Sequence, residues 1–103
     1  MASGQRLELH ELLVGVLGSR NVYFQPPASL QMQYPCILYR RNDMDIKRAN
    51  DRVYSHTTGY MVTVIDANPD SEIPEKLLDF PMCRFDRHYT SENLNHDTYI
   101  LYY

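Results

Sequence analysis

Histidine and carboxylate side chains gather near the C-terminal end of the sequence, where they could hold a metal ion. Asp86-Arg87-His88 lies in one strand-like segment, and His96-Asp97 lies in the next. If these segments pair, His88 and His96 approach each other across the turn. With Asp86 or Asp97 they could hold zinc or iron, because imidazole and carboxylate suit these ions. A small metal-dependent enzyme using His88, His96 and Asp86 is therefore one alternative.

A structural role for the same residues is the other interpretation, and we favour it. Asp86 and Arg87 would then pair with strand neighbours, while His88 and His96 form hydrogen bonds around the turn. The spacing matches no compact metal motif, and both histidines flank a loop. We therefore expect no metal, no catalytic residue and no other cofactor.

Other kinds of catalytic site find less support in the sequence. Cys36 and Cys83 lie inside apolar strand-like runs, which predicts buried free thiols in a reducing cytosol rather than a disulfide. Asp43 and Asp45 suggest calcium, but no glycine or distal glutamate completes a binding loop. No G-x-S-x-G, H-E-x-x-H or glycine-rich phosphate motif occurs. The sequence therefore predicts a protein that is not an enzyme.

Charge and tyrosine content favour contacts with proteins over a grip on nucleic acid. The formal net charge is -3, whereas duplex binding needs a concentrated basic face. A chain that only surrounds DNA remains compatible with this charge. The 103 residues include nine tyrosines, which suit either protein interfaces or half-exposed strands. Candidate interface residues come from a mixed-charge segment and the last strand: Arg40, Arg41, Asp43, Asp45, Lys47, Arg48, Asp51, Arg52, Tyr99 and Tyr103.

Two helices are predicted to position these residues. A broad apolar stripe over residues 7–17, followed by Gly18, predicts a helix with a left-handed C-terminal cap. Residues 1–5 before it are expected to be disordered. A second helix follows a turn at 67–71, where Asp70 or Ser71 can cap it. Its side chains expected to face the sheet are Ile73, Leu77, Leu78 and Phe80.

Strand-like segments fill most of the remaining chain, at 21–24, 34–41, 54–66, 82–89 and 96–103. Alternation places Tyr60 and Val62 on one face and Met61 and Thr63 on the other. Residues 42–53 lack a period and are expected to form a long loop at the tip of a hairpin. The last strand either lies inside the sheet or offers its edge to a neighbour. We predict one α+β domain over 1–103, with a largely antiparallel sheet of four to five strands packed against two helices.

Several segments resemble the small neck and tail proteins of long-tailed bacteriophages. Leu9-His10-Glu11-Leu12 and residues 18–27 (GSRNVYFQPP) resemble their opening, and 34–39 (YPCILY) with 60–66 (YMVTVID) resembles their central hairpin. Residues 70–74 (DSEIP), 85–89 (FDRHY) and 93–96 (NLNH) extend the likeness over nearly the whole chain. The likeness is strongest to the tail terminators, also called tail-completion or head–tail joining proteins.

That resemblance implies a structural virion protein forming a ring, commonly a hexamer, at the head-proximal end of the tail tube. The ring ends tube growth, provides the head–tail joining surface and encloses DNA transiently without reading its sequence. Implied partners are further copies of the chain, the tube protein and a neck or connector protein. By the same likeness, the segment after Arg41 faces the lumen or the tube. A head-completion or connector protein (stopper or adaptor) of the phage neck is the alternative.

The expected location follows from the same likeness and from two patterns in the sequence. No run of residues is long and apolar enough to span a bilayer. Residues 1–6 lack the basic region and apolar run of a signal peptide. We expect a protein that is made in the host cytoplasm, makes no membrane contact and ends in the virion.

Overall fold

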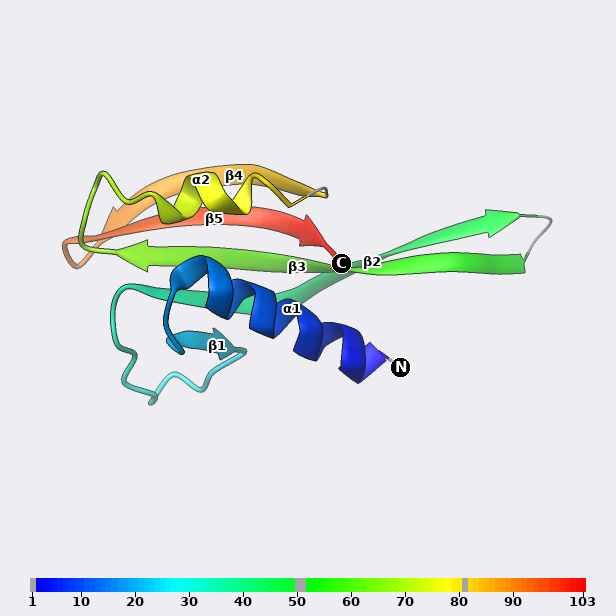
Figure 1. The fold of residues 1–103 in the computed structure, drawn as a ribbon, viewed down its shortest axis with the longest axis horizontal. Helices are drawn as coiled ribbons and strands as arrows, with labels where there is room; N and C mark the ends of the chain where they lie inside the picture. The colour runs from blue at the N-terminus through cyan, green and yellow to red at the C-terminus, as the bar shows by residue number, and fades with distance from the viewer. Residues whose placement is uncertain (1, 50–51, 81) are drawn as a thin grey trace.

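The computed structural model describes residues 2–49, 52–80 and 82–103, with side chains described for 6–42, 58–80 and 82–103. Within this part of the chain, five strands form one sheet in the order β1-β2-β3-β5-β4, and two helices pack against it (Figure 1). β1 runs parallel to β2, and the other neighbouring strands are antiparallel. The predicted α+β fold is thereby confirmed. The elements are α1 Ala2–Leu17, β1 Val22–Phe24, β2 Cys36–Ala49, β3 Arg52–Asp66, α2 Ile73–Leu77, β4 Cys83–Ser91 and β5 Leu94–Tyr102.

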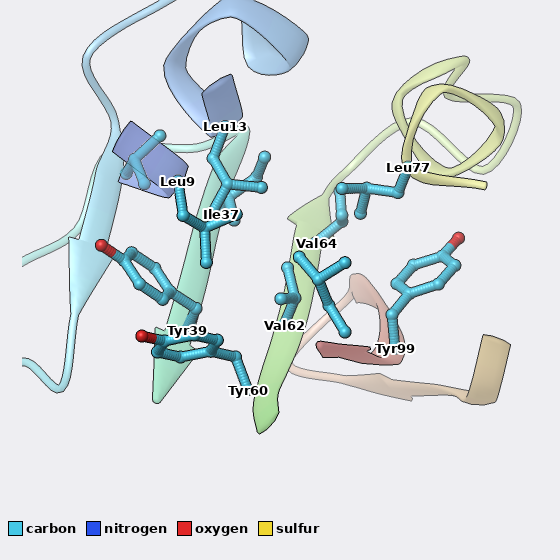
Figure 2. Packing of buried hydrophobic residues seen from close by; sticks show 11 residues of the cluster. Leu9, Leu13, Ile37, Tyr39, Tyr60, Val62, Val64, Leu77 and Tyr99 are labelled. Atoms are coloured by element: carbon cyan, nitrogen blue, oxygen red, sulfur yellow. The ribbon is translucent and has the colours of Figure 1, made fainter. Parts of the chain in front are cut away.

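The core lies between both helices and one face of the sheet (Figure 2). Leu9 and Leu13 are four residues apart, so they lie on the same side of α1, and both are fully buried. Alternate residues of the strands, on the sheet face that α1 covers, pack against these two leucines. The buried cluster consists of Leu9, Leu13, Val22, Ile37, Tyr39, Tyr60, Val62, Val64, Leu77, Tyr99 and Leu101. The predicted common face of Tyr60 and Val62 is therefore confirmed.

The second helix is shorter than the first and buries fewer of its side chains. Leu77 is fully buried, and Ile73 and Phe80 pack partly against the core, as predicted. Leu78 was expected there too, but this prediction is wrong, because its side chain is 51% exposed. It is adjacent to Leu77, and residues next to each other on a helix point about 100° apart.

Gly15 lies inside α1 and Gly18 lies just after its C-terminal end, and the two positions favour different backbone conformations. Gly18 ends the helix at a φ of +81°, and its N–H donates to the carbonyl oxygen of Val14 at 2.8 Å, so the predicted left-handed cap is confirmed. Gly15 lies inside the helix, and no heavy atom lies within 4 Å of a Cβ built there.

Alanine substitution at these glycines should change stability in opposite directions. Gly15→Ala is expected to raise the free energy of unfolding by about 0.5–1 kcal/mol, because alanine has the higher helix propensity. Gly18→Ala should lower it by about 1 kcal/mol, because a Cβ disfavours positive φ. Urea unfolding of both variants measures this pair of effects. A loss of stability in Gly15→Ala, or none in Gly18→Ala, would contradict the assignment.

A long loop was expected at 42–53, but the described residues 42–49 and 52–53 continue the two hairpin strands. β2 and β3 pair from Cys36↔Ile65 to Ala49↔Arg52, so strand backbone reaches both sides of residues 50–51. The register of β3 with β5 ends at Gly59↔Tyr102, and Thr58 still exchanges backbone hydrogen bonds with Tyr103. Beyond Thr58, the described residues of β2 and β3 pair only with each other. This two-stranded extension, 43–49 with 52–58, is called the ribbon here. It extends away from the helices and the other strands (Figure 1).

Main-chain pairing explains why the polar segment is not a loop. A hairpin strand continues as long as its N–H and C=O groups find partners, whatever the polarity of the side chains. A register shift between Arg41 and Asp43 marks the point where the ribbon leaves the sheet. Bulges of this kind bend and twist a strand pair. At about 3.3 Å per residue, the ribbon extends roughly 20 Å from that point.

The last strand was expected either to lie inside the sheet or to offer its edge to a neighbour. In the structure, β5 lies inside the sheet between β3 and β4. Its edge is therefore not available to a neighbour. The turn before it has Glu92 at φ +53° and Asn93 at φ +66°, the positive pair that a tight type I′ hairpin turn needs. The interval 90–95 between the last two predicted strands thus shortens to these two residues. At the other end of the chain, α1 includes residues 2–5, which the sequence assigned to a disordered terminus.

Candidate functional site

The two histidines of the possible metal site lie on opposite faces of the sheet. His88 is paired with Asp97 and Tyr89 with His96 in successive positions of the β4–β5 register. Successive residues of a strand point to opposite faces. Nδ1 of His88 lies 2.8 Å from a carboxylate oxygen of Asp97, while the His96 ring stacks on Tyr89 with centroids 4.7 Å apart. The alternative metal site of His88, His96 and Asp86 is therefore not formed.

Asp86 has a structural role at a bulge in β4. The register shifts between Phe85 and Arg87, which leaves Asp86 without a partner residue on β5. The Thr98 hydroxyl lies 3.1 Å from Oδ2 of Asp86 and accepts a hydrogen bond from the Arg87 backbone N–H at 3.2 Å. Among the described residues, no group of three or more His, Cys, Asp or Glu side chains is arranged to hold a metal ion. The C-terminal cluster is thus a set of strand-to-strand contacts.

The two cysteines, Cys36 and Cys83, do not form a catalytic site either. Cys36 is fully buried and Cys83 half-buried, and both are free. Burial raises the pKa of each thiol to about 11, which opposes formation of a nucleophilic thiolate. The buried free thiol expected at Cys36 is confirmed, while Cys83 is only partly covered.

A polar contact joins α1 to β2 at the edge of the core. The Tyr39 hydroxyl lies 2.7 Å from Nδ1 of His10 and accepts a hydrogen bond from Arg6 at 3.4 Å. Burial lowers the pKa of His10; Glu11 opposes this shift, and Arg6 and Arg20 add to it. Because Arg6 donates to the hydroxyl oxygen, we infer that the hydroxyl donates its proton to the neutral imidazole.

This contact predicts that the protein loses stability in acid. The folded-state pKa of His10 lies below its ordinary value of about 6.5, so the folded state favours the neutral ring. The stabilisation is complete above that value and is lost as the pH falls through the folded pKa. His10→Gln keeps an acceptor but cannot titrate. Urea unfolding at pH 7 and pH 5 should show a smaller pH effect in the variant, and an equal effect would contradict this role.

A groove of about 530 Å³ lies on the sheet face opposite the helices. Gln25, at the end of β1, has a φ of +44° and accepts a hydrogen bond from the Arg41 N–H through Oε1 at 3.1 Å. This contact holds the following segment, 26–32, beside β2. We call the hollow the Arg40 groove; Pro27, Leu30 and Met32 line it from the segment, and Leu38, Arg40 and Met61 from the strands.

The solvent-facing side of α1 is the second feature with unusual chemistry. Leu7 and Leu12 are 54% and 46% exposed and flank Glu8 and Glu11 beside Tyr103. These five residues, with Gly15, are called the α1 outer face. The sequence contained a signal for it, because the apolar stripe over 7–17 is too broad for a helix that buries one side. The apolar pattern alone does not separate this face from the core-facing residues.

The candidate interface residues are divided by the structure. Arg40 and Arg41 are exposed beside the groove, and Tyr103 is half-buried beside α1. The prediction of Tyr99 as an interface residue is wrong, because only 1% of its surface is exposed in the subunit. Its ring packs edge-on against Phe85, with the ring centroids 5.5 Å apart. Asp51 and the side chains of the other candidates, Asp43, Asp45, Lys47, Arg48 and Arg52, lie outside the described part of the chain.

Comparison of the chain with protein-family models, with curated proteins and with solved structures finds no match. In the described part of the chain, neither helix is both long and apolar enough to cross a membrane.

Proposed function

We propose that this chain is a structural virion protein that forms a ring at the head-proximal end of a phage tail tube. The ring ends tube growth and presents the surface to which the head connector joins. Its subunits act through shape and contact, without a cofactor. The likeness of the sequence to tail terminators motivates the proposal, and the ribbon is the structural observation that carries it.

The ribbon supports an assembly role because it has little to hold it in an isolated subunit. A two-stranded hairpin is marginally stable in water unless a third strand or another surface packs on it. The described ribbon pairs with no third strand beyond Thr58. A long, two-stranded extension of this kind is suited to lie along another protein. In the proposed ring, it contacts the tail tube.

The charge of the chain suits a ring through which DNA must pass. The net charge of -3 gives DNA phosphates little to bind, so the duplex can move through the ring without being held. In the proposed ring, the chain therefore encloses DNA transiently and does not bind it tightly. Its stable partners are other copies, the tube and the connector.

Electron microscopy of tail tubes mixed with the labelled protein tests this proposal. We expect label at one end of each tube, with none along its length. Serum albumin carrying the same label is the control for adhesion to tube ends. Label scattered along the tubes, or label that binds purified portal complexes and ignores tubes, would contradict the proposal.

A further inference from the structure

The α1 outer face has the properties of a surface that is covered in an assembly. Leu7 and Leu12 are each about half exposed, although leucine gains free energy from burial. Gly15 continues this face by one turn, and the space above it is open. A glycine inside a helix costs stability and lets another backbone approach closely. These features favour a partner that packs directly on α1.

The Arg40 groove has the complementary shape and charge. Leu30, Leu38 and Met61 give it apolar walls, and Arg40 and Arg41 are exposed at its rim. Among the described residues, its lining contains no carboxylate, whereas the lining of the α1 outer face contains two carboxylates and no cation. Leucines beside carboxylates on one surface therefore match an apolar groove beside arginines on the other.

One molecule cannot join these two surfaces to each other. α1 packs against the sheet face that holds Ile37 and Val62. Leu38 and Met61 alternate with those residues, so the groove lies on the opposite face. The surfaces are thus separated by the sheet, and a groove can receive the outer face only from another molecule.

We propose that a second copy of this chain fills the Arg40 groove with its α1 outer face. Leu7 and Leu12 enter the apolar part of the groove, and Glu8 and Glu11 approach Arg40 and Arg41. The contact joins two different surfaces, so it repeats from copy to copy and closes into a ring if the rotation allows. It deepens the proposed function, on which it rests for the identity of the assembly, by naming the surfaces between subunits.

Neighbouring charges show which acid carries most of the attraction. Arg20 donates to Oε2 of Glu11 at 2.7 Å, so this carboxylate already has a partner on its own chain. The described ion pairs do not include Glu8. Arg6 points the other way, with its guanidinium over the Phe24 ring and a hydrogen bond to Tyr39. Glu8 is therefore the main negative charge that the outer face offers to a groove.

A charge exchange between two variants tests the proposed contact in the free protein. One variant is Arg40→Glu/Arg41→Glu, and the other is Glu8→Lys/Glu11→Lys. Each variant alone places like charges at the contact, and we expect at least about 100-fold weaker self-association than in the wild type. An equal mixture restores opposite charges at every contact. Its mass, measured by light scattering over a concentration series, should return to the wild-type value.

Controls separate this result from misfolding and from general charge effects. All four positions are exposed, and the circular dichroism of both variants should match that of the wild type. Glu75→Lys and Lys76→Glu change exposed charges on α2 and should leave the mass unchanged. A wild type that stays monomeric, a variant with wild-type mass, or a mixture that fails to assemble would each overturn the proposed contact. Assembly without binding to tube ends would instead retain the contact and overturn the proposed function.

Discussion

The free energy of unfolding of Leu13→Ala is expected to be about 3 kcal/mol lower than that of the wild type. Leu13 is fully buried between α1 and the sheet, and truncation removes apolar contacts and leaves a cavity. A loss of this size is a large part of the 5–15 kcal/mol that typically holds a domain together. Urea unfolding at low protein concentration, where self-association does not contribute, measures the effect.

Leu12→Ala is the matched control for this prediction, because the same change is made one residue earlier in the same helix. Leu12 is 46% exposed, so its truncation should change stability by no more than about 0.5 kcal/mol. Equal losses in the two variants would contradict the orientation of α1, and with it the assignment of an outer face.

Removal of the ribbon is expected to abolish binding to tube ends while the rest of the fold remains. Residues 45–57 would be replaced by Asn-Gly, so that a tight turn joins Met44 to Thr58, which pair with each other in the sheet register. Every core residue that the structure describes lies outside the deleted segment. Co-sedimentation with tail tubes should show loss of binding, and thermal unfolding should keep one cooperative transition. Full tube binding by this variant would contradict the role of the ribbon.

A finer variant tests which part of the ribbon makes the contact. Asp43→Lys/Asp45→Lys keeps the strand length and reverses two charges at the base of the ribbon. We expect weaker joining with an unchanged fold. Asp70→Lys/Asp79→Lys reverses two exposed charges that precede and follow α2, outside the ribbon, and is the control. Equal binding by both variants would remove Asp43 and Asp45 from the interface.

Elements with a regular apolar pattern could be predicted from the sequence, because local periodicity reports burial. The stripe that includes Leu9 and Leu13 predicted α1, and alternation along 54–66 predicted that Tyr60 and Val62 share one face of the sheet. Gly18 marked the end of the helix because few other residues accept its positive φ. In each case the cause lies within a few residues of its effect.

Features that depend on distant pairing could not be predicted in the same way. The strands extend through 42–49 and 52–53 because main-chain groups pair across the hairpin, and no side-chain pattern reports this. Tyr99 was assigned to an interface because tyrosine suits both protein interfaces and half-exposed strands, whereas the position of β5 inside the sheet buries this side chain. The Arg40 groove requires segment 26–32 to lie beside β2 and β3, which no single segment reveals.

Tube length tests the central claim, that this chain forms a ring that ends tail-tube growth, most directly. Tube protein would be allowed to polymerise with increasing amounts of this chain, and the lengths would be measured in electron micrographs. Added protein is expected to shorten the tubes, to leave one ring at the capped end and to stop elongation there. Tubes that grow to the same length at every concentration, with the chain unbound, would contradict this claim.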